Sequence, residues 1–121
     1  MEQYTAAMDP ARVPPNHPEA EKGVLGSMLR SRDAALIALE SLQAEDFYNP
    51  ANREIFSAMQ AISAGGRPID LVTLDDELSR RGRLDAVGGA PYLVEISRAV
   101  PSSANIRAYV KIVDERSTLR K

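Results

Sequence analysis

The stretch NPANREIFSAMQAISAGG, residues 49–66, carries a complete set of helix signals and decides the fold class. Asn49 suits the cap before a helix, and Pro50 suits the first helical position, where its missing N–H costs nothing. Apolar side chains recur on one face at helical spacing, and the paired glycines at the end favour a left-handed cap. We therefore expect a helix over residues 50–64 with one buried face.

Helical spacing of apolar residues extends to both sides of this stretch. Because no segment alternates apolar and polar residues convincingly, the expected class is all-α with about six helices. Residues 1–17, which include Pro14-Pro15, predict a disordered or extended N-terminal arm. The other expected helices are 18–29, 34–42 capped by Asp33, one opened by a Thr73–Asp76 capping box, one after Gly88-Gly89, and one from Ser102 or Ser103 to the last residue.

Residue content and missing motifs argue against catalysis. The chain has no cysteine, and its single histidine, His17, cannot by itself build a zinc site or a Ser-His-Asp triad. No G-x-x-x-x-G-K-[ST] phosphate loop is present, so the usual route to ATP hydrolysis is missing. The run Asp75-Asp76-Glu77 is explained by the dipole of a helix N-terminus rather than by a metal. We expect a non-catalytic domain without catalytic, cofactor or metal sites.

Charge and hydropathy favour a cytoplasmic protein that binds little DNA directly. The net charge is −2, whereas DNA-binding domains are usually basic. No apolar run approaches the roughly 18 residues that a membrane span needs. The N-terminus lacks the layout of a signal peptide. No membrane association is expected.

The last predicted helix has two apolar faces. At about 100° per residue, one stripe contains Ile106, Tyr109, Val110 and Val113, and a second contains Ala108, Ile112 and Leu119. Such a helix is either wedged between elements of its own domain or packed against a second molecule. The helix also reaches the last residue without a stop signal, so we expect the chain to be part of a longer protein.

Two polar side chains stand out on the predicted helices. Glu21 falls within an apolar stripe, either as a first-turn acid paired with an arginine or as an acid placed for a partner's cation. Tyr92 follows a glycine turn and is either half-buried core with a hydrated hydroxyl or an interface anchor. The sequence leaves both pairs of alternatives open.

Five motifs occur in order between residues 13 and 121. They are Pro14-Pro15 with Glu19-Ala20-Glu21 and Val24-Leu25-Gly26; Asp46-Phe47-Tyr48 with Ile55-Phe56; Asp70-Leu71-Val72-Thr73-Leu74; Gly88-Gly89-Ala90-Pro91-Tyr92-Leu93; and Val100-Pro101-Ser102-Ser103-Ala104-Asn105 with Tyr109 and Ile112-Val113. The series resembles the N-terminal domain of DnaB-type replicative DNA helicases. Each motif alone is weak, but five in series at compatible spacing are specific.

The resemblance implies a small globular helical head over residues 18–86 and a C-terminal helical hairpin over residues 87–121, truncated before the linker and the ATPase domain. In the family, hairpins pair into dimers, and three dimers form a collar on a hexamer. This collar docks the helicase-binding domain of primase and regulates helicase activity. A helicase loader is a further partner that the resemblance allows. ATP and Mg²⁺ belong to the absent ATPase domain, so the parent protein is expected to be an ATP-dependent helicase.

Carried over residue by residue, the resemblance makes Glu19 and Tyr92 the candidate primase-binding residues. The candidate residues for self-association through the hairpin are Ile106, Tyr109, Val110, Ile112, Val113 and Leu119.

Two alternative functions remain open. The first is the helicase-binding domain of a primase, which resembles this fold, although the Pro-Pro motif and the Asp-Leu-Val-Thr motif favour the helicase. The second is a helix-turn-helix DNA-binding module that uses the helix starting at Thr73. Asp75, Asp76 and Glu77 on that helix would repel phosphate, although Arg80, Arg81 and Arg83 follow.

Overall fold

A computed structural model describes residues 13–121, so most of the predicted N-terminal arm, residues 1–12, lies outside the described residues. The described part is all-helical and contains no strand, which confirms the predicted class. Its six α-helices and two short 3₁₀ helices are α2 (Pro18–Arg30), α3 (Arg32–Ser41), η2 (Ala44–Asp46), α4 (Pro50–Ala64), α5 (Leu71–Arg80), η3 (Asp85–Val87), α6 (Gly89–Ser97) and α7 (Ile106–Arg120).

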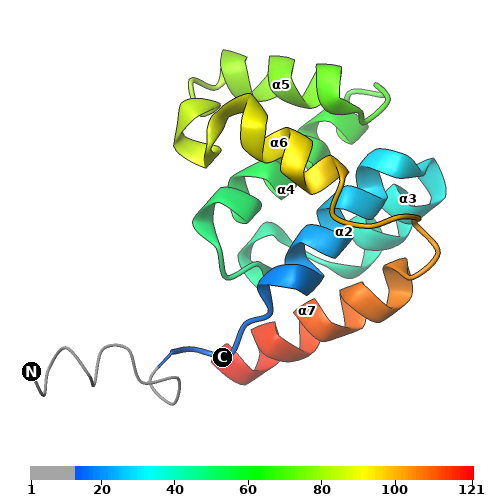
Figure 1. Cartoon of the computed structure of the whole chain (residues 1–121), viewed down its shortest axis with the longest axis vertical. Coiled ribbons are helices and arrows are strands. Elements are labelled where there is room, and N and C mark those ends of the chain that lie inside the picture. Colours follow the sequence, from blue (N-terminus) through cyan, green and yellow to red (C-terminus); the bar gives the residue numbers. More distant parts are fainter. Residues whose placement is uncertain (1–12) are drawn as a thin grey trace, which may run out of the picture.

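Helix α2 is the central element of the fold. Figure 1 shows it between α6 on one side and α7 on the other, and it also contacts α3 and α4. Most of its residues are buried, including Val24 and Leu25. Helix α2 is thus covered on both faces and contacts α3, α4, α6 and α7, so it fixes where these four helices lie.

Two glycines allow this crowding around α2. A Cβ atom at Gly23 would lie 2.9 Å from Cδ2 of Tyr109 in α7. A Cβ atom at Gly26 would lie 2.5 Å from the backbone oxygen of Ile96 in α6. A larger residue at Gly26 would push against the backbone of α6, and one at Gly23 would push against the Tyr109 ring. The cost of glycine within a helix is therefore offset by close packing.

Helix α4 forms the other half of the core. It spans Pro50–Ala64 as predicted, and the Asn49 side chain accepts a hydrogen bond from the Ala51 N–H. Its apolar face is fully buried, and the ring of Phe56 packs against that of Phe47 at 5.0 Å between centroids. The local cap and the apolar stripe together fix this helix and its orientation.

Three predicted helix starts were wrong. Helix α3 is capped by Ser31, whose side chain accepts the Ala34 N–H, and not by Asp33. Helix α5 begins after Asp70, which is the first residue of the capping box, and Thr73 is its last residue, the third residue of the helix. Helix α7 begins at Ile106, after Asn105, and neither Ser102 nor Ser103 precedes it directly. In the first two cases an earlier side chain reaches the free N–H groups of the first turn.

The arrangement of α6 and α7 differs from that of two helices packed side by side as a hairpin. Helix α6 packs against α2 and α5, whereas α7 packs against α2, α3 and η2, and Figure 1 shows them on different sides of α2. The physical reason is that each helix buries its own apolar residues against other parts of the domain: Leu93 and Ile96 of α6, and Ile106, Val110 and Val113 of α7. The predicted boundary between head and hairpin, residues 86 and 87, stays a prediction.

Candidate functional site

A buried polar network connects α2, α4 and α6. The hydroxyl of Tyr92 donates a 2.6 Å hydrogen bond to Oδ1 of Asn52, and Nδ2 of Asn52 donates a 2.8 Å bond to Oε1 of Glu21. Burial raises the pKa of the Tyr92 hydroxyl above its usual value, whereas the positive charge of Lys22 and the bond to Asn52 oppose the rise. Tyr92 is half-buried, and its hydroxyl is held by the bond to Asn52.

The structure decides the role of Glu21, which neither sequence alternative described. Its carboxylate accepts hydrogen bonds from the backbone N–H groups of Tyr48, at 2.6 Å, and Asn49, at 3.3 Å, as well as from Asn52. No arginine pairs with it among the described residues, and only 2% of its surface is exposed. Glu21 therefore fixes the loop that precedes α4, because a buried carboxylate needs several donors.

Glu19 and Tyr92 lie on one surface, which we call the Lys22 face: Glu19, Lys22, Tyr92 and Glu95. Lys22 of α2 donates a 2.7 Å hydrogen bond to Glu95 of α6, and this bond raises the pKa of the lysine above its ordinary value. The charge of Glu19 and the hydroxyl of Tyr92 also act on Lys22. Glu19 is exposed. The structure thus brings together two candidate residues that lie far apart in the sequence.

The first apolar stripe of α7 is covered by the chain itself. Ile106, Val110 and Val113 are buried in the core, and the ring of Tyr109 is partly buried against Gly23. We call these four residues the inner stripe. In this structure Ile106, Val110 and Val113 are not available to a second molecule.

The second stripe of α7 faces outward. Ala108 is exposed, Ile112 is half-buried, and Leu119 is 68% exposed. We call these three residues the outer stripe. Of the two environments that the sequence left open for α7, its own domain covers the inner stripe, while within residues 13–121 Ala108 and Leu119 of the outer stripe stay exposed and Ile112 is only half-covered.

Polar contacts fix the end of α7, and the sequence analysis missed them. Ser117 is buried and donates a 2.6 Å hydrogen bond to Oδ1 of Asp46. Arg120 donates to the backbone oxygens of Pro15 and Asp46, both at 2.7 Å, and its guanidinium lies 5.5 Å from the centre of the Tyr48 ring. The one available signal was Ser117, a small polar residue on the buried side of an apolar helix.

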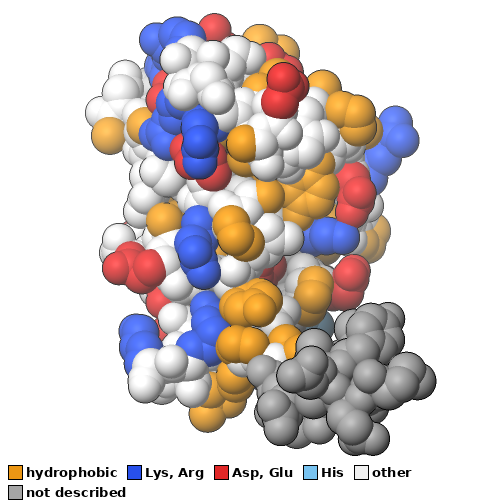
Figure 2. Space-filling view, turned by 90° about the vertical axis from the view of Figure 1, so that its left-hand side faces the viewer, with side chains coloured by type: hydrophobic (Ala, Val, Ile, Leu, Met, Phe, Trp, Pro, Cys, Tyr) orange, Lys and Arg blue, Asp and Glu red, His pale blue; other side chains and the backbone are white. Residues whose placement is uncertain are grey.

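The arginines at and after the end of α5, the helix considered for DNA recognition, form ion pairs with acidic residues of the same chain. Arg81 donates to Glu77 at 3.0 Å and to Glu54 of α4 at 2.9 Å, and the bond to Glu77 lowers the pKa of that carboxyl. Arg80 and Arg83 are likewise paired, with Glu77 and Glu54. Figure 2 shows blue side chains mixed with red and orange ones on the face it displays. These pairs join α5 to α4 and reduce the positive potential that phosphate binding needs.

None of the helices in the described part is long and apolar enough to span a membrane. Within residues 13–121, no three His, Cys, Asp or Glu side chains are grouped so that they could hold a metal ion.

Comparison with known proteins places this arrangement in one family. The family model for the DnaB-like helicase N terminal domain matches residues 13–115. The replicative DNA helicase DnaC of Bacillus subtilis is 43% identical over 110 residues, which are 91% of this chain and 24% of the relative. The replicative DNA helicase DnaB of Geobacillus stearothermophilus is 44% identical over a segment of the same length and coverage.

A solved structure agrees with this result. The crystal structure of the N-terminal domain of DnaB helicase from Mycobacterium tuberculosis superposes with a TM-score of 0.87 at 44% identity. The match covers 89% of this chain and 75% of that one. The chain spans about a quarter of the length of the two curated relatives, which are 24% covered. With these matches across its helices, the chain belongs to the family of DnaB-like helicase N-terminal domains.

Proposed function

We propose that this chain is the non-catalytic assembly domain of a replicative helicase, which pairs with a second copy of itself and docks primase. The observation that carries the proposal is the difference in burial between the two apolar stripes of α7. Its inner stripe is buried against the head, while Leu119 of the outer stripe is 68% exposed. An amphipathic helix with an apolar stripe that its own domain leaves open offers a surface that a partner helix can cover.

Self-pairing is tested with two substitutions in the outer stripe. Ile112→Asp and Leu119→Asp introduce a charge where apolar contact is required, so both are expected to convert a dimer to a monomer in analytical ultracentrifugation. Because Ile112 is half-buried in the chain itself, Leu119→Asp is the cleaner variant. Asp114→Asn, on the polar face of the same helix, is the matched control and should leave the dimer intact. A wild type that stays monomeric at high concentration contradicts pairing by this chain alone.

For primase, we propose docking on the Lys22 face. The supporting observation is that Lys22 and Glu95 hold α2 and α6 together at 2.7 Å beside Glu19 and Tyr92. A partly exposed tyrosine with an anchored hydroxyl loses little conformational entropy on binding, which suits an interface anchor.

Titration calorimetry with the helicase-binding domain of primase tests this docking. Glu19→Ala and Tyr92→Ala are expected to weaken binding about tenfold or more, the range of a central contact residue. Asp33→Ala, an exposed acid on α3, is the matched control. If both variants bind like the wild type and keep its circular dichroism spectrum, the Lys22 face does not dock primase.

ATP hydrolysis with Mg²⁺ is assigned, within the same proposal, to the part of the relatives that this chain does not span. The regulation of that activity, and the binding of a helicase loader, would then act through the same two surfaces.

A further inference from the structure

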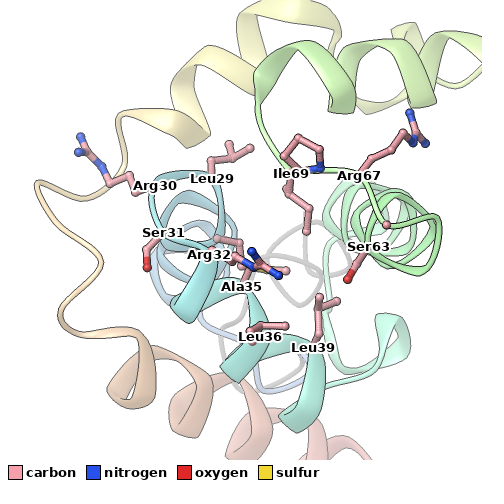
Figure 3. A pocket seen from close by; sticks show the side chains of 13 residues that line it. Leu29, Arg30, Ser31, Arg32, Ala35, Leu36, Leu39, Ser63, Arg67 and Ile69 are labelled. Carbon is pink, nitrogen blue, oxygen red and sulfur yellow. The ribbon is translucent and has the colours of Figure 1, made fainter.

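A groove on the side of α3 has an apolar floor. It has a volume of about 380 Å³ and lies between the corner that joins α2 to α3 and residues 63–69. Figure 3 shows Leu36 and Leu39 of α3 on one side of it and Ile69 on the other. Binding pockets typically have volumes of roughly 300–1,000 Å³, so the groove is large enough to hold several side chains of a bound peptide.

Arginines supply the charge around this groove. Arg30, Arg32 and Arg67 are the charged residues among those that line it. Arg67 is paired with Glu77 at 3.2 Å, whereas none of the ion pairs formed within residues 13–121 includes Arg30 or Arg32. Both of these arginines are exposed, and Figure 3 shows the Arg32 side chain extending over the apolar floor. The groove therefore favours an occupant that carries negative charge.

The apolar lining distinguishes between kinds of anionic occupant. It consists of aliphatic and methionine side chains, and none of the described residues that line the groove is aromatic. Single-stranded nucleic acid binds largely by stacking its bases on aromatic rings, so this floor gives the bases no platform. A floor of leucine and isoleucine side chains is instead complementary to the apolar side chains of a peptide. The lining thus favours an acidic peptide over a nucleic acid.

We propose that the groove binds a short acidic segment of a partner protein, in which leucine, isoleucine or phenylalanine side chains stand beside a carboxylate. The apolar side chains of this segment cover Leu36, which is 45% exposed, and enter the floor between it and Ile69. The carboxylate pairs with the guanidinium of Arg32, a geometry that allows two parallel hydrogen bonds. Leu36 and Leu39 are three residues apart, so they form one continuous apolar wall for the segment.

The groove differs in position from the surfaces to which pairing and primase docking are assigned. The outer stripe lies on α7, the Lys22 face lies on α2 and α6, and none of their residues lines the groove. A peptide bound there covers none of the residues that serve those two tasks. The inference therefore goes beyond the proposed function, because it adds a third surface for a further partner of acidic and apolar character.

Fluorescence anisotropy with a defined probe tests the proposal. The probe is the labelled peptide Leu-Glu-Asp-Leu-Phe-Glu, titrated with the whole chain. We expect saturable binding that weakens about tenfold or more when every acid of the peptide is replaced by lysine. Replacing its leucines and phenylalanine by alanine should weaken binding to a similar degree, about tenfold. Absence of saturable binding by the first peptide, or equal binding of all three peptides, overturns the proposal.

Charge reversal on the chain locates the site. Arg32→Glu should weaken binding of the acidic peptide about tenfold and strengthen binding of the lysine peptide. Arg107→Glu, the same change at an exposed arginine on α7, is the matched control and should bind the acidic peptide like the wild type. Circular dichroism checks that both variants fold. If the two variants behave alike, the peptide binds through general charge attraction and not in the groove, which contradicts the proposal.

Two further outcomes would assign the groove to a different occupant. Displacement of the peptide by single-stranded oligothymidylate at moderate salt would identify a nucleic-acid site. A change in the mass of the chain in light scattering on introducing Arg32→Glu, without peptide, would identify a contact between copies. Either result overturns the proposal, whereas peptide binding that depends on Arg32 and is insensitive to oligothymidylate supports it.

Discussion

Helices α6 and α7 pack against the same helix at glycines three residues apart, yet they are held in different ways. The backbone of α6 lies directly against α2, because a Cβ atom at Gly26 would lie 2.5 Å from the backbone oxygen of Ile96. Helix α7 meets α2 through a side chain, the ring of Tyr109, over Gly23. Behind α6 lies the buried Tyr92–Asn52–Glu21 network, whereas α7 relies on polar contacts at its end.

The difference shows that α6 is enclosed by its own domain, whereas α7 leaves part of its apolar surface exposed. Helix α6 lies between α2 and α5, and a change in its backbone position would disturb the core. Helix α7 lies on the outside, with one stripe covered and another uncovered. A helix of the second kind can contact a partner while its inner stripe stays in the head.

The largest expected effect on the free energy of unfolding concerns the two glycine contacts of α2. Gly26→Ala places a methyl group against a backbone oxygen, and overpacking of this kind costs about 2–3 kcal/mol of the free energy of unfolding. Gly23→Ala meets a ring that can tilt, and alanine favours a helix by about 1 kcal/mol over glycine, so the net cost should be below about 1 kcal/mol. Urea denaturation measures both. Equal costs would mean that α7 is packed as rigidly as α6.

The next effect separates the two stripes of α7. Val113→Ala removes buried methyl groups and should reduce the free energy of unfolding by about 1–2 kcal/mol. Leu119→Ala changes an exposed side chain and should stay within about 0.5 kcal/mol of the wild type. Thermal unfolding at a concentration where both proteins are monomeric gives the comparison. A large loss of stability in Leu119→Ala would mean that Leu119 packs against its own domain and is not exposed.

An effect of similar size separates the polar contacts that hold each helix. Ser117→Ala leaves the Asp46 carboxylate with one donor fewer, and loss of a bond to a charged group costs about 1.5–3 kcal/mol when buried. Tyr92→Phe removes a bond to the neutral Asn52 amide at a partly exposed site, which should cost about 1 kcal/mol. Denaturation of the two single variants measures this order. The reverse order would make the α6 network the stronger attachment.

The smallest effect lies outside both contacts and concerns pH. The hydrogen bond from Arg81 lowers the pKa of Glu77 in the folded chain. A carboxyl with a lowered pKa stabilises the fold above its unfolded pKa of about 4.3, and that contribution is lost as the pH falls through the folded value. Glu77→Gln should therefore flatten the acid side of the stability–pH curve while the difference between α6 and α7 variants stays the same. An unchanged acid limb would show that the pair with Arg81 does not form.

Local signals made α2 and α4 predictable from the sequence. The Asn49-Pro50 start and the apolar stripe of α4 act within a few residues, and so does the proline at the start of α2. The starts of α3 and α5 were misplaced because two candidate caps stood within a few residues of each other, and which one binds the first turn depends on the path of the preceding loop.

Contacts between residues far apart in the chain could not be predicted from the sequence. The spacing in α7 gave two apolar stripes but not what covers each, because periodicity defines a face and not its neighbour. Glu21 was noticed as an acid in an apolar stripe, but its partners are backbone N–H groups 27 and 28 residues away. The ion pair of Lys22 with Glu95 joins residues 73 apart and has no local signature.

We propose that one small domain carries two independent contact surfaces, the outer stripe for pairing and the Lys22 face for primase. Light scattering of the wild-type chain with and without a primase C-terminal domain tests it most directly. We expect a dimer alone and, with primase added, a larger complex in which the two copies of the chain remain together. A monomer whose mass does not change when primase is added would contradict the claim, and so would a dimer that separates as primase binds.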